Sequence, residues 1–108
     1  MPRRGEVWWV RLDPTLGSEI AKTKPCLVIS STVINQHRRT VVVVPLSTAT
    51  QASPPLLVPV RCGERDVVAV VDQVRAVSKM RLDRCLGELS PEHLEAVEQA
   101  LRDVLELD

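Results

Sequence analysis

One stretch of the chain carries many side chains that could bind a ligand or react. Between two apolar segments, residues 6–12 and 26–30, lies a polar connection with carboxylates, a hydroxyl and two lysines: Asp13, Ser18, Glu19, Lys22 and Lys24. A simple turn needs none of these groups. Loops that are held on a rigid β scaffold commonly carry binding and catalytic residues. We therefore expect the functional site to include this connection.

A second set of polar residues follows two later apolar segments. The hydroxyls of Ser47, Thr48 and Thr50 come after one segment, and Asp72 and Gln73 come after another. Hydroxyls and lysines suit the transesterification of an RNA phosphodiester by its own 2′-OH. That reaction needs an oriented 2′-oxygen, neutralised charge on the phosphate oxygens and assisted proton transfer. By residue type alone the indication is weak, because most proteins contain such residues.

Other chemistries find less support. His37 lies in a polar stretch and His93 in the first turn of an expected exposed helix, so we interpret both as surface residues. Cys26, Cys62 and Cys85 lack the spacing of metal ligands, and we expect neither a metal nor a cofactor. The sequence shows no signal peptide and no segment long enough to span a membrane. We expect a cytoplasmic protein with reduced, buried thiols.

The apolar residues predict a mainly β protein. Valine dominates, and short β-branched segments are separated by proline and polar residues, a pattern typical of strands. The expected strands are residues 6–12, 26–30 (started by Pro25), 40–44 (ended by Pro45), 56–60, and 67–71, which 72–77 continue. Residues 31–39 are expected to form a loop or a helical turn.

The end of the chain predicts a helix. Ser90 can cap its N-terminus, Pro91 suits the first turn, and apolar residues recur at a spacing of three and four from Leu94 to Val104. The whole pattern therefore predicts about five or six short strands and a terminal helix. We expect residues 1–108 to form one domain, a small twisted β barrel or half-barrel with helices covering one opening.

The charges are unevenly distributed. Residues 1–54 carry seven Lys/Arg against three Asp/Glu, whereas residues 55–108 carry seven against eleven. One interpretation is a solvated surface with random asymmetry. The other is a basic face for an anionic ligand, with the acidic residues collected on the C-terminal helix.

Over nearly its whole length the sequence resembles the MazF/PemK family of type II toxins. The most specific part is the Asp-Pro-Thr-x-Gly-Ser-Glu unit of residues 13–19 with the Lys24–Pro25 pair, and the likeness continues through 43–48, 63–66 and 71–75. The resemblance implies an SH3-like β barrel, usually a homodimer, that pairs with an acidic antitoxin. It also implies metal-independent, sequence-specific cleavage of single-stranded RNA, with messenger RNA as the expected substrate. The products would be a 2′,3′-cyclic phosphate and a 5′-hydroxyl, and translation and growth would be inhibited.

The resemblance also implies catalytic residues. Lys24 and Ser47 stand where many relatives have an arginine and a threonine, and Glu19 is the third expected catalytic residue. Lysine keeps the positive charge but lacks the planar pair of N–H donors with which a guanidinium binds two phosphate oxygens. Serine keeps the hydroxyl of threonine. Thr48 replaces Ser47 as the partner if the strand register shifts by one. The expected RNA contacts are Ser18, Lys22, Thr48, Thr50, Asp72 and Gln73.

Several alternatives stay open at this point. Glu19 could only shape the first loop, and Asp72 and Gln73 could only anchor it. Trp8 and Trp9 alternate across a strand, so one is expected in the core, and the other would contact a base, a second copy or an antitoxin. At the level of function, a gyrase-poisoning toxin of the same fold and a catalytically weakened toxin that keeps antitoxin binding are the alternatives.

Overall fold

The computed structural model describes residues 2–12, 23–48 and 51–108. Two α-helices, two 3₁₀ turns and seven strands occur in this part of the chain. In order they are β1 (Glu6–Arg11), β2 (Thr23–Val28), α1 (Thr32–His37), β3 (Thr40–Ser47), β4 (Leu57–Cys62), β5 (Arg65–Val70), η1 (Val71–Gln73), β6 (Arg75–Ser78), η2 (Lys79–Arg81), β7 (Leu82–Glu88) and α2 (Pro91–Leu105).

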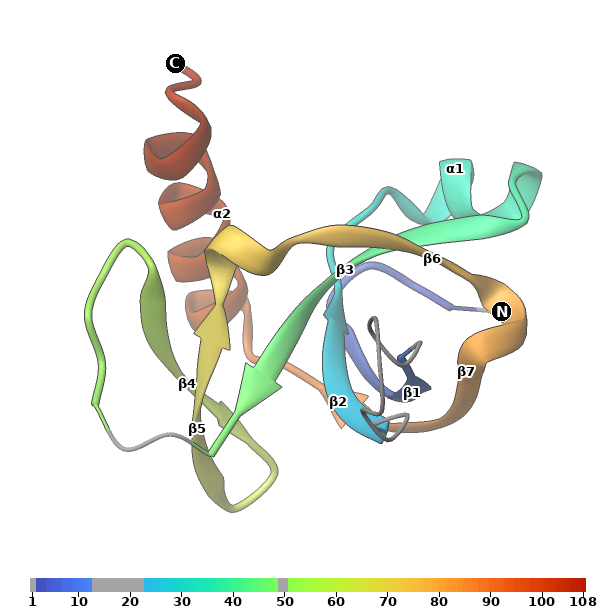
Figure 1. Ribbon diagram of the computed structural model, residues 1–108, viewed down its shortest axis with the longest axis horizontal. Helices are drawn as coiled ribbons and strands as arrows, with labels where there is room; N and C mark the ends of the chain where they lie inside the picture. The colour runs from blue at the N-terminus through green and yellow to red at the C-terminus, as the bar shows by residue number, and fades with distance from the viewer. Residues whose placement is uncertain (1, 13–22, 49–50) are drawn as a thin grey trace, which may run out of the picture.

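The strands form one curled, half-barrel sheet, which confirms the predicted mainly β fold with a C-terminal helix. Its order is β4-β5-β3-β2-β1-β7, and β6 pairs with β3 beside this path. All pairs are antiparallel. The short η2 joins β6 to β7 and closes one end of the curl (Figure 1). No helix in the described ranges is both long enough and apolar enough to cross a bilayer.

The sheet packs on both of its sides because side chains alternate along each strand. The first cluster includes Leu27 and Val44 and lies against α2. The second cluster fills the inside of the curl, where Val28 and Val43 are fully buried. Neighbouring residues of β2 and β3 thus enter different clusters, and these two strands support both.

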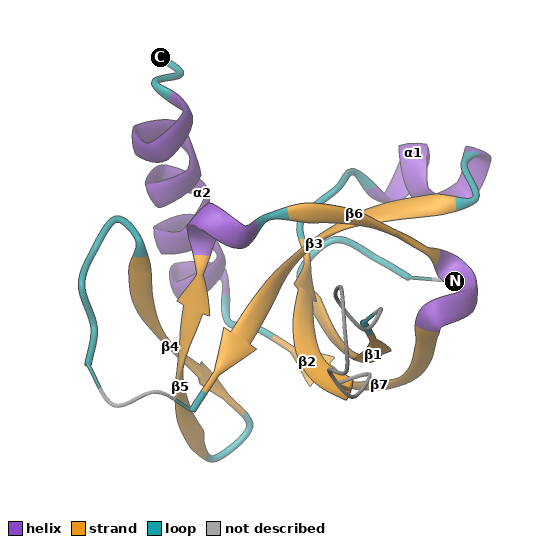
Figure 2. Cartoon of the chain, viewed as in Figure 1, coloured by secondary structure: helices purple, strands orange, loops and turns teal. Residues whose placement is uncertain are grey.

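The predicted terminal helix is confirmed. The Ser90 hydroxyl accepts a hydrogen bond from the backbone N–H of His93 at 3.2 Å, and Pro91 is the first residue of α2. The apolar stripe packs on the first cluster, with Val97 fully buried. Residues 31–39, for which a loop or a helical turn was expected, contain the short helix α1 (Figure 2).

Proline positions account for two differences from the predicted strands. Pro45 does not end β3, because the strand continues to Ser47 by changing its partner from β2 to β5. Pro25 lies inside β2 and not at its start. The β2–β3 ladder begins only at Cys26, directly after Pro25, which has no N–H to donate to a further pair.

The later part of the chain also differs from expectation. Residues 72–77 do not continue β5, because η1 breaks the strand and β6 starts afresh at Arg75. The prediction missed β7, whose exposed residues lack the apolar pattern of a strand. The expectation of buried thiols holds for Cys26 alone, since Cys62 is half-buried and Cys85 exposed; all three are free.

Candidate functional site

Five of the nine expected site residues fall within the described ranges. These are Lys24, Ser47, Thr48, Asp72 and Gln73. The other expected residues, Ser18, Glu19, Lys22 and Thr50, lie outside them. The site is therefore built from β2, β3, η1 and β6.

Lys24 and Ser47 lie where two neighbouring strands separate. The β2–β3 ladder runs from Val28↔Val43 to Cys26↔Pro45 and stops there. Lys24 and Ser47 are each two residues past this last pair, so they are the next positions on the same side of the two strands. We call this place the β2–β3 fork and define it by Lys24, Cys26, Pro45 and Ser47.

The fork has a chemical cause. The Ile29 N–H donates to the Val42 carbonyl at 2.9 Å, so the backbone groups of alternate β2 residues back to Pro25 face β3, and Pro25 has no N–H to donate there. From Leu46 onward β3 pairs with β5 instead, with Ser47 opposite Val68. Figure 1 shows β3 running away from β2 toward β5. Ser47 is half-buried at the end of the strand, and Thr48 follows it as an exposed residue.

Arg75 is a site residue that sequence reasoning missed. It begins β6 on the other side of β3, opposite Val43, and it is exposed. Burial raises the pKa of the Cys26 thiol to about 12, while the positive charges of Arg75 and Lys24 act to lower it. Lys24 lies two residues before this thiol on β2, and Arg75 lies on β6, on the far side of β3 from β2. The sequence did contain one sign of where Arg75 lies. Residues two apart on a strand share a face, and Val77, two residues after Arg75, is buried in the second cluster.

Asp72 and Gln73 lie in η1, directly before β6. Both side chains are exposed, whereas Val71 beside them is fully buried. The Val74 N–H donates to the Val71 carbonyl at 3.2 Å and closes the turn. The turn thus holds an exposed carboxylate three residues before Arg75 and an exposed amide two residues before it. Their predicted contact with the first loop falls on residues outside the described ranges.

The two histidines are engaged elsewhere. His37 Nδ1 is 2.8 Å from the Val33 carbonyl oxygen within α1. His93 Nδ1 accepts a hydrogen bond from the backbone N–H of Arg61 at 3.1 Å, which joins α2 to β4. His37 is exposed, as the interpretation of it as a surface residue requires, whereas His93 is half-buried.

Both tryptophans are half-buried, so neither is the fully buried core residue that was expected. Trp8 packs on the second cluster, and its indole N–H donates to Glu6 Oε1 at 3.0 Å. Trp9 belongs to neither cluster and is half-buried between its cross-strand partners Pro25 and Arg84.

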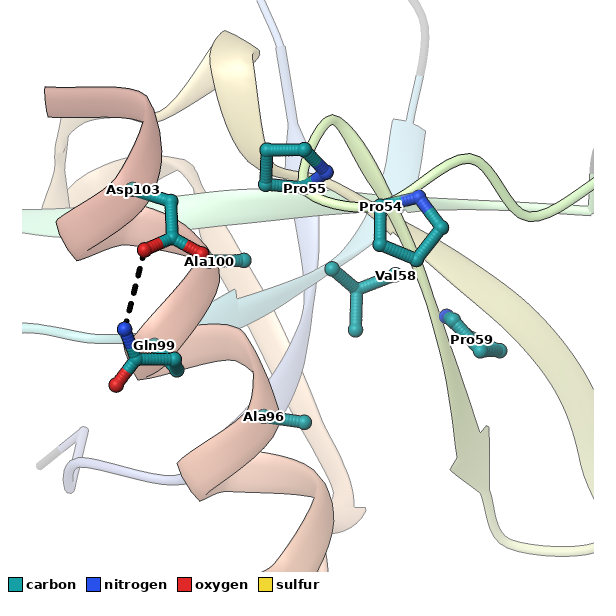
Figure 3. A pocket seen from close by; sticks show the side chains of 8 residues that line it. All are labelled: Pro54, Pro55, Val58, Pro59, Ala96, Gln99, Ala100 and Asp103. Carbon is teal, nitrogen blue, oxygen red and sulfur yellow. Dashed lines mark hydrogen bonds between the residues drawn. The ribbon is translucent and has the colours of Figure 1, made fainter.

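A groove beside α2 is apolar and separate from these residues. It has a volume of about 550 Å³ and lies between α2 and the start of β4 (Figure 3). Its lining consists of Pro54, Pro55, Val58, Pro59, Ala96, Gln99, Ala100 and Asp103. The one carboxylate in it accepts a hydrogen bond from Gln99 at 3.1 Å. The groove holds none of the candidate site residues.

Comparison with known proteins gives consistent results. Residues 3–105 match the family model described as PemK-like, MazF-like toxin of type II toxin–antitoxin system. The chain is 34% identical over 110 residues to endoribonuclease EndoA of Bacillus subtilis, covering 97% of this chain and 95% of that protein. It is also 34% identical over 98 residues to the endoribonuclease toxin MazF of Escherichia coli, covering 90% and 87%.

The structure is similar to solved structures as well. A mycobacterial endoribonuclease in complex with its cognate antitoxin superposes with a TM-score of 0.81 at 29% identity. The match covers 100% of this chain and 98% of that one.

Proposed function

Because the chain belongs to the family of PemK-like, MazF-like toxins of type II toxin–antitoxin systems, we propose that it is an endoribonuclease that cleaves single-stranded RNA. The names of the two similar proteins support this activity. The observation that carries the proposal is the strand register, which places Lys24 and Ser47 at equivalent positions past the last β2–β3 pair and Arg75 opposite Val43 on the neighbouring β6. A phosphodiester is the kind of group that lysine and arginine side chains bind.

The proposed reaction is an internal transesterification. The 2′-oxygen of one nucleotide bonds to the adjacent phosphorus, and the bond from phosphorus to the 5′-oxygen breaks. The proton leaves the 2′-hydroxyl, and a proton is delivered to the 5′-oxygen. The products are a 2′,3′-cyclic phosphate and a 5′-hydroxyl, and the bonds balance without a further reactant.

The described residues have distinct proposed roles. Lys24 supplies a point charge to the phosphate oxygens, and the Arg75 guanidinium can grip two oxygens at once. Charge that develops in the transition state is stabilised by such preorganised groups. The hydroxyl of Ser47, or of its neighbour Thr48, donates a hydrogen bond to the scissile phosphate.

The remaining residues are assigned on the resemblance. Glu19 orients the first loop or assists a proton transfer. We propose RNA contacts for the other expected residues, which are Ser18, Lys22, Thr50, Asp72 and Gln73. Asp72 and Gln73 are exposed next to Arg75, which supports contact with bases or ribose at the same end of the barrel.

We also propose the biological setting. Residues 1–108 act as one toxin domain, as a homodimer in the cytoplasm, and the RNA is messenger RNA. An acidic segment of a cognate antitoxin competes with RNA for Lys24 and Arg75. The mycobacterial endoribonuclease bound to its antitoxin supports a partner of this type.

The test is cleavage of mixed-sequence single-stranded RNA in the presence of EDTA. We expect fragments that end in a 2′,3′-cyclic phosphate. Lys24→Ala should lower the rate by about 10²–10³-fold, the loss seen for one transition-state donor. Arg75→Gln should cause a loss of similar order, and Lys24→Arg should retain activity. Arg65→Gln, an exposed change on the β4–β5 hairpin, is the control.

Two results would contradict the proposal. One is RNA that stays intact with the unaltered protein, and the other is cleavage that Lys24→Ala leaves unchanged. Intact RNA together with inhibited supercoiling by gyrase would favour the gyrase-poisoning alternative. Far-UV circular dichroism of each variant shows whether it is folded.

A further inference from the structure

An inner strand of the sheet has a proline at a position that would otherwise donate a hydrogen bond. β2 lies between β1 and β3, and Pro25 is its third residue. The Ile29 N–H donates to the Val42 carbonyl, and alternate residues of an antiparallel strand face the same neighbour. The nitrogen of Pro25 therefore faces β3. Inner strands seldom have proline at such a position, because proline cannot donate to the ladder.

The group that Pro25 leaves without a donor from β2 is the carbonyl of Leu46. The register pairs Cys26 with Pro45, so Pro25 stands opposite Leu46, which is fully buried. The backbone groups of Leu46 face β2, and those of Ser47 face β5, because the two sides of a strand alternate. Any other residue at position 25 would place an N–H against this carbonyl and extend the β2–β3 ladder by one bond.

Both arms of the β2–β3 fork are held by other strands. β2 stays paired with β1 as far as Thr23, beyond the point where it leaves β3. β3 is paired with β5 as far as Ser47 (Figure 1). Lys24 and Ser47 thus each lie on a paired strand, and the opening between β2 and β3 sets the distance between them.

An unbroken ladder would place these two residues directly opposite each other. Lys24 and Ser47 would form the next pair, of the type without hydrogen bonds between its members, with Cα atoms about 4.5 Å apart. Side chains in such a pair are in contact with each other. A phosphate then has no room between the ammonium group and the hydroxyl, whereas an open fork provides that room.

We propose that Pro25 is a positioning residue of the site. Because it has no N–H, it keeps the β2–β3 fork open, so that Lys24 and Ser47 can contact one phosphate from two different strands. This inference rests on the proposed endoribonuclease function. Pro25 acts through these two residues, and its contribution is a bond that it prevents.

The experiment has to separate the missing N–H from the packing of the proline ring. Trp9 is the partner of Pro25 on β1 and is half-buried, so removal of the ring also changes this contact. Two variants therefore both lack the ring. Pro25→Ala has an N–H at position 25. An ester variant carries lactic acid, the hydroxy analogue of alanine, at the same position, and its ester oxygen cannot donate.

A second proline in a strand provides the control. The Arg61 N–H donates to His93 of α2, so the nitrogens of alternate β4 residues, including Pro59, face away from β5. Pro59→Ala thus restores an N–H at the outer edge of the sheet, away from the fork. It should leave the cleavage rate unchanged.

Three quantities are measured for each variant. They are the exchange of the amide hydrogen at position 25 by NMR, the urea midpoint, and kcat and KM for cleavage of mixed-sequence single-stranded RNA. In Pro25→Ala we expect an amide hydrogen that is protected from exchange and a higher urea midpoint than in the ester variant, because the new bond to Leu46 forms. Its kcat should be about 10²-fold below that of the ester variant, the loss that a misplacement of about 1 Å can cause. A variant that gains stability and loses activity cannot owe the loss to poor folding.

Three results would overturn the proposal. An amide at position 25 that exchanges freely would show that the ladder is not extended. A Pro25→Ala protein that is less stable than the ester variant, or that does not fold, would show that the new bond does not form. Equal kcat values in the two variants, whether normal or low, would show that the N–H does not control the site.

Failure of this inference can be told apart from failure of the proposed function. If the unaltered protein cleaves RNA and Pro25→Ala cleaves it equally well, only the role of Pro25 is excluded. If the unaltered protein does not cleave RNA, the proposed function fails and the role of Pro25 fails with it.

Discussion

Lysine and arginine are not interchangeable as phosphate ligands, and the candidate site has one of each. Lys24 comes from β2, where it is half-buried, whereas Arg75 begins β6 and is exposed. An ammonium group is a compact charge, and a guanidinium adds a planar pair of donors. In the proposed site, Arg75 would therefore supply the bidentate contact that Lys24 cannot make.

Cys26 should make the stability of the protein depend on pH in alkaline solution. Its thiol keeps its proton in the folded chain up to a pKa of about 12, whereas the unfolded chain loses it near pH 9. Above pH 9 the unfolded state therefore binds fewer protons, and stability falls as pH rises. We expect the free energy of unfolding to decrease by about 1.4 kcal/mol per pH unit from this group.

The measurement is urea unfolding between pH 8 and about pH 10.5 for the unaltered protein and Cys26→Ala. The variant lacks the thiol, so its stability should fall less steeply above pH 9. Cys85→Ala, which removes an exposed thiol, is the control and should keep the steep fall. Parallel curves for the unaltered protein and Cys26→Ala would contradict the prediction.

At the level of elements, α2 depends on its first residues. The Ser90 hydroxyl accepts a hydrogen bond from the backbone N–H of His93, and this bond satisfies one of the free donors at the start of the helix. We predict that Ser90→Ala lowers the free energy of unfolding by about 1 kcal/mol. Ser90→Asp preserves the acceptor and should be close to neutral. Urea unfolding of both variants tests this, and equal effects of Ala and Asp would argue against a capping role.

Sequence patterns predicted the elements that depend on local signals. The helix after Ser90 has a cap and an apolar stripe, and residues 40–44 are β-branched, so both were found. The partner change at Pro45 depends on β5, which is distant in sequence, and no local pattern reveals it. The exposed strand β7 is held by pairing with β1, which residue types do not encode.

The candidate site was predictable to a similar extent. Lys24 and Ser47 followed from the family resemblance, and the register of β2 and β3 places them at equivalent positions past the last pair. Arg75 was missed because its relation to Cys26 crosses from β6 over β3 to β2. Proximity across three strands arises from topology, and a linear reading of the chain does not contain it.

At the level of the whole molecule, the two clusters share strands. Leu27 and Val44 enter the first cluster, while their neighbours Val28 and Val43 enter the second. Neither cluster can lose β2 or β3 without exposing the other. We therefore expect the protein to unfold in a single cooperative transition.

Two probes can test this cooperativity. Tryptophan fluorescence reports on Trp8 in the second cluster, and circular dichroism at 222 nm reports largely on α2, which packs on the first. The urea midpoints from the two signals should coincide. A helix signal that changes at a different urea concentration from the fluorescence would show that the clusters unfold separately.

The acidic α2 and η2, which lies among the basic residues 75–87, are on opposite sides of the molecule, and this affects how the protein meets its ligand (Figure 2). With a formal net charge of zero, a distant polyanion attracts the molecule only weakly as a whole. The separated charges nevertheless form an electric dipole, so the field of an RNA strand exerts a torque that turns residues 75–87 toward it and α2 away. Encounters become pre-oriented within about a Debye length, about 10 Å at 0.1 M salt. The association rate, and not only the affinity, should then fall as ionic strength rises.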